Sequence, residues 1–305
     1  MENVLEVKDV HKHLGKREII KGISFNVKEG EIFGFLGPNG AGKTTTIRML
    51  VGMIKPNNGS ISIMGHDINK DKVNALKHIG AVVENPEMYT YLSGMDNLKL
   101  VASLRNIPKK DLEDVIEMVN LKDRINDKVK KYSLGMKQRL GLASALIGKP
   151  SLLILDEPTN GLDPTGILDF REIVKKAARE RNTAVLISSH ILSEVQHLCD
   201  TVAFINKGTI QSIESIKDGT VNNKTDTVVL VIRESEKCSE ILKTMEYIYD
   251  FTSENNVFTL NVKADSTPEI VFNLAKNNIA VREIYKKNSD LEERYMELVE
   301  GGVRS

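Results

Sequence analysis

The feature that most restricts the fold of this chain is the run Gly37-Pro38-Asn39-Gly40-Ala41-Gly42-Lys43-Thr44, which matches the pattern G-x-x-x-x-G-K-[ST] in full. It follows the apolar segment Ile32–Leu36 and precedes a segment with apolar residues at helical spacing. Strand, loop and helix are therefore expected in that order. Glycines in such a loop let backbone N–H groups face phosphate oxygens, and the helix N-terminus adds the positive end of its dipole. A glycine-rich turn with an unrelated lysine is the alternative, and the strand and helix in register argue against it.

The chemistry assigns a role to each part of this loop. Lys43 supplies a full positive charge for the β and γ phosphates of a nucleotide, and Thr44 offers a hydroxyl to Mg²⁺. The residues expected to bind ATP here are Gly37, Pro38, Asn39, Gly40, Ala41, Gly42, Lys43, Thr44 and Thr45.

Strand-sized apolar segments alternate with amphipathic ones up to residue 217, which predicts an α/β domain with a mostly parallel sheet. The expected strands are Leu5–Val7, Ile23–Val27, Ile32–Leu36, Ser60–Ile63, Ala81–Val83, Leu152–Leu155, Ala184–Ser188 and Val202–Ile205. The expected helices are Lys43–Val51, Asp111–Val119, Gly135–Ile147, Ile167–Arg179 and Leu192–Leu198.

A smaller domain is expected after a polar linker at residues 218–225. Residues 226–305 have the element order βαββαβ, which predicts a ferredoxin-like α+β module with an accessory role. Its expected elements are Thr227–Arg233, Cys238–Met245, Tyr247–Thr252, Val257–Val262, Pro268–Lys276 and Ala280–Tyr285, followed by a last helix that begins at Ser289.

Composition excludes some classes of function. Lys+Arg and Asp+Glu both total 42, so no net charge attracts nucleic acid, and no nucleic-acid partner is expected. The two cysteines fit no C-x-x-C pattern and are expected to be free thiols. The first residues lack the basic-then-apolar order of a secretion signal, and no apolar run approaches the roughly 20 residues that cross a bilayer. We therefore expect a cytoplasmic protein.

Two adjacent carboxylates, Asp156 and Glu157, end the apolar segment Leu152–Leu155. Side chains alternate along a strand, so the two carboxylates are expected to serve different roles. Asp156 is placed to hold Mg²⁺ through a water, and Glu157 to activate the attacking water as general base. A polar turn after a strand is the alternative.

The run Tyr132-Ser133-Leu134-Gly135-Met136-Lys137-Gln138-Arg139, which stands before Asp156, resembles the signature motif of ABC ATPases. Here it has the form S-L-G-M instead of the commoner S-G-G-Q. Apolar spacing shows that a helix begins just after Ser133. In the family this helix N-terminus reaches the ATP held by the other subunit, which implies that Ser133 and Gly135 complete the site of a second chain. A homodimer of cassettes is implied in turn.

Other stretches resemble the family's motifs in the same order. Pro158–Pro164 resembles its D-loop, which would place Asp163 at the subunit junction. His190, after the apolar segment Ala184–Ser188, resembles the switch histidine that contacts the γ-phosphate. The resemblance covers residues 1–217 and implies a P-loop NTPase fold: a RecA-like core, an antiparallel β subdomain, and a helical subdomain at about 85–148.

Two positions depart from the family pattern. Glu84 stands where the Q-loop glutamine is usual, and it is expected to meet Mg²⁺ or the attacking water; a misalignment by a residue or two is the alternative. Leu14 stands where an aromatic residue usually stacks on adenine. Leu14 would cover the base by apolar contact, or His13 would stack on it, and His13 as an ordinary surface residue remains an equal possibility.

Glu84, the signature form and the extra C-terminal module together resemble exporters of the bacitracin- and lantibiotic-resistance type. The resemblance implies an ATPase on the inner face of the cell membrane that powers a separate permease and does not itself bind the cargo. A nutrient importer subunit, a soluble ABC protein acting on ribosomes or DNA, and an inactive binding module are the alternatives.

Overall fold

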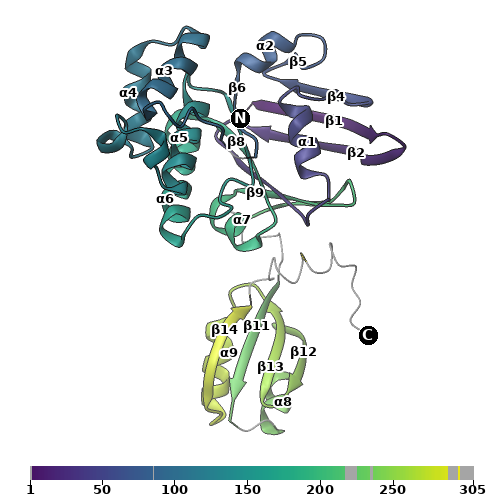
Figure 1. Cartoon of the computed structure of the whole chain (residues 1–305). Coiled ribbons are helices and arrows are strands. Elements are labelled where there is room, and N and C mark those ends of the chain that lie inside the picture. The colour runs from purple at the N-terminus through teal and green to yellow at the C-terminus, as the bar shows by residue number, and fades with distance from the viewer. Residues whose placement is uncertain (1, 85, 217–224, 234–235, 288–294, 296–305) are drawn as a thin grey trace. The chain divides into compact units, whose positions relative to one another are not determined.

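The computed structural model describes residues 2–84, 86–216, 225–233, 236–287 and 295 (Figure 1). The described residues up to Ile216 form one compact unit, and those from Thr225 to Lys287 belong to a second. Each unit has its own hydrophobic core, so each is described by itself.

The first unit contains a six-stranded sheet that positions the predicted motifs. Its strands, in spatial order, are β10 (Thr209–Ser215), β9 (Thr201–Asn206), β3 (Ile32–Leu36), β8 (Ala184–Ser189), β7 (Leu152–Asp156) and β6 (Ile79–Val82). All neighbours from β9 to β6 run parallel, and only β10 pairs antiparallel. The predicted mostly parallel sheet is therefore confirmed.

The strand order explains why distant motifs meet. In β3, β7 and β8 every residue is buried, as parallel strands covered on both faces must be. Because β8 pairs with β3 on one side and β7 on the other, Leu36 lies beside Ser189, and Asp156 beside Ser188. The loop after β3, the carboxylates after β7 and the histidine after β8 therefore share one edge of the sheet.

A second sheet of the first unit is antiparallel. It contains β2 (Arg17–Lys28), β1 (Asn3–Leu14), β4 (Asn58–Ile63) and β5 (His66–Asp67), in that spatial order. Strands β1 and β2 form a hairpin closed by Gly15 and Lys16. The hairpin is much longer than the two short strands expected, because its outward residues are polar and the apolar pattern marks only its buried part.

Seven α-helices are described in the first unit. They are α1 (Lys43–Leu50), α2 (Lys72–Lys77), α3 (Gly94–Arg105), α4 (Lys109–Met118), α5 (Leu134–Leu146), α6 (Pro164–Arg181) and α7 (Leu192–Leu198). In Figure 1, α3, α4 and α5 gather on one side of the unit, opposite α1 and the antiparallel sheet. Sequence patterns missed α2 and α3. In α3, Leu100 and Leu104 are exposed, so its apolar residues do not define a single face.

The second unit has one sheet with two helices packed on one face (Figure 1). Its elements in chain order are β11 (Thr225–Ile232), α8 (Glu236–Leu242), β12 (Ile248–Glu254), β13 (Val257–Lys263), α9 (Thr267–Lys276) and β14 (Val281–Lys287). The spatial order is β12-β13-β11-β14, and all neighbours are antiparallel. The order βαββαβ is as expected. The predicted linker lies outside the described residues except for Thr225, and the helix expected from Ser289 lies outside them too.

Both cysteines are buried free thiols, as expected from their spacing. Burial raises the pKa of both, that of Cys238 to about 11, so the thiols stay protonated near neutral pH. Among the helices of the described residues, none combines the length and apolar character needed to span a bilayer.

Candidate active site

The loop between β3 and α1 has the shape expected of a phosphate cradle. At Gly37 an added Cβ would lie 2.2 Å from the carbonyl oxygen of Ile205, so only glycine fits. Gly42 is the N-cap of α1 and has φ 112°, a backbone conformation that residues other than glycine rarely adopt. The N–H groups at the N-terminus of a helix have no acceptor within the helix and point toward the preceding residues, here the loop. The loop can therefore receive an anion.

Lys43 lies within this loop and is almost fully buried. Its ammonium donates to the carbonyl oxygen of Gly37 at 2.7 Å and lies 3.1 Å from Oε1 of Glu157. A buried ammonium needs such partners, because its desolvation is otherwise costly. An incoming phosphate would offer Lys43 a stronger acceptor at the same place.

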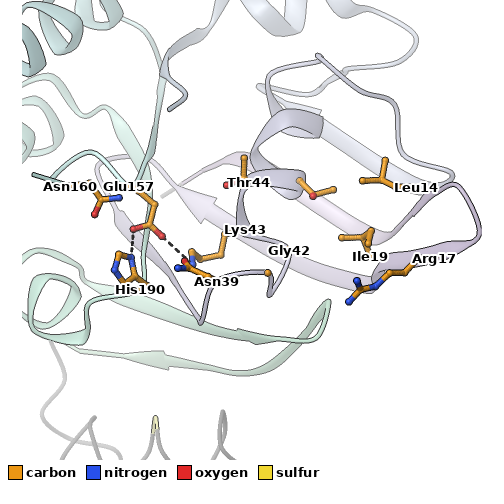
Figure 2. Close-up of a pocket in the computed structure, with 12 residues that line it drawn as sticks. Leu14, Arg17, Ile19, Asn39, Gly42, Lys43, Thr44, Glu157, Asn160 and His190 are labelled. Atoms are coloured by element: carbon orange, nitrogen blue, oxygen red, sulfur yellow. Dashed lines mark hydrogen bonds and ion pairs between the residues drawn. The ribbon is translucent and has the colours of Figure 1, made fainter. Parts of the chain in front are cut away.

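Glu157 connects Lys43 to His190. Its Oε2 lies 2.6 Å from Nδ1 of His190, and both interactions are drawn in Figure 2. The backbone of Glu157 has φ 48°, a left-handed conformation that costs about 1–2 kcal/mol for such a residue. Its N–H donates to both the carbonyl oxygen (3.2 Å) and Oγ (3.0 Å) of Ser188, which holds that conformation.

Asp156 is buried behind Glu157, and its Oδ1 accepts a hydrogen bond from Oγ of Ser188 at 2.6 Å. The described residues contain no group of three or more His, Cys, Asp or Glu that would enclose a metal ion. Mg²⁺ does not need such a cage, because it keeps several waters and binds substrate phosphates. The oxygens of Asp156 and of Thr44, in the first turn of α1, are of the kind that suits this ion.

A cavity of about 420 Å³ joins these groups to the β1–β2 hairpin. The predicted site residues that line it are Leu14, Asn39, Gly40, Gly42, Lys43, Thr44, Thr45, Glu157 and His190. Figure 2 shows Glu157 and His190 at one end and Leu14 at the other, with Lys43 and Thr44 between them. The volume of the cavity suits a nucleotide, with its phosphates at the loop.

Three lining residues were missed from the sequence: Arg17, Ile19 and Asn160. Arg17 and Ile19 lie on β2, directly after the two-residue turn that follows Leu14. The signal available for them was the hairpin itself, since its pairing brings the start of β2 beside the end of β1. Asn160 stands within the stretch assigned to the D-loop but was not singled out.

Several predicted residues do not line this cavity. Ser133 caps α5 by accepting from the N–H of Met136 at 3.2 Å, and Asp163 caps α6 by accepting from the N–H of Gly166 at 2.9 Å. Gly135 follows Ser133 in the first turn of α5. The cavity lining also excludes Gly37, Pro38, Ala41 and Asp156. The carbonyl oxygens of Gly37 and Pro38 instead accept from the ammonium of Lys43. The nucleotide roles of Ser133, Gly135 and Asp163 remain predictions.

Glu84 also lies outside the cavity lining. Its carboxylate forms an ion pair with Arg48 of α1, and φ at Glu84 is 61°. The predicted contact of Glu84 with Mg²⁺ or water stays a prediction.

The family model, the similar sequences and the similar solved structure all belong to ABC transporters. The family model described as "ABC transporter" matches residues 20–160. The chain is 45% identical to the uncharacterized ABC transporter ATP-binding protein YhcH of Bacillus subtilis (strain 168), over 98% of this chain and 96% of the relative. It is 38% identical to the bacitracin transport ATP-binding protein BcrA of Bacillus licheniformis, over 99% of both chains. A solved ATP-binding subunit of an ABC transporter superposes with TM-score 0.64 at 28% identity, over 71% of this chain and 91% of the other.

Proposed function

Because this chain belongs to the ABC transporter family as an ATP-hydrolysing, ATP-binding subunit, we propose that it powers an exporter that removes antimicrobial peptides or similar amphiphiles from the membrane. The observation that supports ATP hydrolysis is the contact of Glu157 with both Lys43 and His190 at one end of the cavity. The cargo class rests on similarity to BcrA along the whole chain, including the second unit.

In this proposal each group of the site has a role in hydrolysis. Lys43 and the first N–H groups of α1 bind the β and γ phosphates, and Glu157 accepts the proton of the attacking water. His190 orients Glu157 and contacts the γ-phosphate. When bound, Mg²⁺ would be held by Thr44 and Asp156 and would neutralise charge that develops on the phosphate oxygens.

A second copy of the chain completes the site in this proposal. The N-terminus of α5, with Ser133 and Gly135, does not line the cavity of its own chain. A capped helix N-terminus is nevertheless suited to an anion, so it is free to approach the γ-phosphate bound by a partner. Two chains arranged head to tail would enclose two ATP molecules, with Asp163 at the junction.

The chain would work in the cytoplasm, attached to the inner face of the cell membrane through its permease. Binding of ATP would close the pair of cassettes, and hydrolysis would open it. The permease would convert these two states into a change of access for the cargo. The cassette itself would not bind the cargo.

Deletion of the gene tests the proposed export. We expect the deletion strain to become more sensitive to bacitracin or to a lantibiotic, as measured by minimum inhibitory concentration. The parental gene should restore resistance, and Glu157→Gln should not. A strain whose sensitivity is unchanged and which instead fails to take up a nutrient would contradict export and favour the importer alternative.

Nucleotide selectivity should follow from the base end of the cavity. Leu14 is half exposed and offers apolar contact without an aromatic face, so we expect ATP and GTP to bind within about three-fold of each other, less than 1 kcal/mol. Leu14→Tyr should tighten binding about five-fold or more, because stacking on a base is worth about 1–3 kcal/mol. Competition against a fluorescent ATP analogue measures both effects.

The matched control for this test is Leu104→Tyr, at an exposed leucine of α3 that does not line the cavity. It should leave both affinities unchanged. Equal tightening by the two substitutions, or a strong preference for ATP in the parental chain, would show that Leu14 does not meet the base.

A further inference from the structure

Glu194 is a buried carboxylate that the chemistry above does not use. It lies in the first turn of α7, four residues after His190, and only 8% of it is exposed. Burial of a carboxylate is costly unless hydrogen bonds compensate for the lost hydration. The hydrogen-bond partners of Glu194 therefore indicate its role.

The two partners of Glu194 come from different segments of the site. Its Oε2 accepts from Oγ1 of Thr159 at 2.7 Å and from Oγ of Ser189 at 3.0 Å. Thr159 follows Glu157 by two residues and precedes Asn160, which lines the cavity. Ser189 ends β8 and directly precedes His190. Oε2 of Glu194 thus connects the segment that follows Glu157 to the residue that precedes His190.

Neighbouring bonds strengthen this connection. Oγ of Ser189 also accepts from the N–H of Ile191 at 2.9 Å, so the backbone on both sides of His190 is held. Thr159, Ser189 and Glu194 are all buried, which favours hydrogen bonds in a low dielectric environment. The 2.6 Å contact between Glu157 and His190 lies between the two segments that Glu194 joins.

We propose that Glu194 is a positioning residue: through Thr159 and Ser189 it holds the start of the D-loop at a set distance from His190, so that His190 and Glu157 act together. The inference rests on the proposed hydrolysis and deepens it. It also gives a route by which a second cassette that contacts the D-loop changes the position of His190. Glu194 itself does not line the cavity.

The test is steady-state ATP hydrolysis by the full-length chain. Glu194→Ala should lower kcat by about 10- to 100-fold, the cost of a misplacement of roughly 1 Å, and change KM for ATP by less than about two-fold. Glu194→Gln should retain most of the turnover, because its carbonyl oxygen can accept from both hydroxyls. Thr159→Val should resemble Glu194→Ala, and Thr159→Ser should restore the hydroxyl and the rate.

Two controls separate positioning from general damage. Thr183→Val removes another buried threonine hydroxyl of the same unit, bonded to the carbonyl oxygen of Pro150 at 3.2 Å, and should leave kcat unchanged. In a His190→Ala background, Glu194→Ala should cost less than about two-fold, since its effect acts through His190.

The outcomes distinguish this inference from the proposed function. A parental chain without ATPase activity would overturn both. An active parent in which Thr159→Val and Thr183→Val behave alike would overturn the role of Glu194 alone. So would an undiminished effect of Glu194→Ala in the His190→Ala background. If Glu194→Ala fails to fold, the Thr159→Val and Thr159→Ser pair decides the question by itself.

Discussion

Glu157→Gln should bind ATP at least as tightly as the parental chain and hydrolyse it about 10²- to 10⁴-fold more slowly. Glutamine keeps an oxygen that can contact His190, but it cannot accept a proton from water. The substitution also removes the negative charge that lies 3.1 Å from the ammonium of Lys43. Lys43 then loses no ion pair with Glu157 when it binds a phosphate. Isothermal titration with ATP and a phosphate-release assay measure the two quantities.

Glu172→Gln is the matched control, because Glu172 lies on the exposed side of α6 and does not line the cavity. It should change neither binding nor turnover. Dimers of Glu157→Gln should also accumulate in the presence of ATP, because the closed pair cannot proceed to hydrolysis. Size-exclusion chromatography detects these dimers. Phosphate release at the parental rate would refute the assignment of Glu157 as general base.

Gly135→Asp should lower ATP turnover by about 10²-fold or more while leaving the fold and single-chain ATP binding intact. An added Cβ at Gly135 meets only Cδ2 of Leu162, at 3.8 Å, which is ordinary contact. An acidic residue in the first turn of α5 is even favourable for the helix. The proposal therefore attributes the expected loss of turnover to charge repulsion against the triphosphate bound by the partner chain. Thermal unfolding, ATP titration and phosphate release separate these effects.

A mixture of two inactive variants makes the test sharper. In the proposed dimer, Lys43→Ala damages the cradle of one chain, and Gly135→Asp damages the helix that the other chain offers to its partner. A mixed dimer retains one intact site, built from the cradle of the Gly135→Asp chain and the α5 N-terminus of the Lys43→Ala chain. Equal amounts should recover roughly a quarter of the parental rate, because half of the random dimers are mixed and each has one site of two. No recovery would contradict a shared site.

The parts of the fold that the sequence predicted well are those with continuous apolar segments. Ile32–Leu36 has the expected bounds, and β7 differs from its expectation by one residue. Such segments are buried on all sides, so their composition alone marks them. The antiparallel hairpin and α3 are half exposed, and their bounds depend on pairing and packing that a local pattern does not contain.

The same distinction applies to the site. The cradle and the carboxylates could be found because each motif is contiguous in sequence, and the strand order then brings them together. Arg17 and Ile19 reach the cavity through hairpin pairing, and the pair of Arg48 with Glu84 joins residues 36 apart in the chain. The bond of Thr159 to Glu194 spans 35 residues. No spacing rule predicts such contacts, since they depend on the arrangement of whole elements.

Strand β8 has hydrogen-bonded neighbours on both edges, and every one of its residues is buried. The cradle, Glu157 and His190 therefore stand at the ends of three hydrogen-bonded strands, which fixes the points at which these segments leave the sheet. A motion that couples nucleotide binding to transport would then occur outside these strands, for example as a tilt of α3, α4 and α5 against the sheet. Residues at the boundary between these helices and the sheet, which lie away from the reacting atoms, would then set the rate of transport.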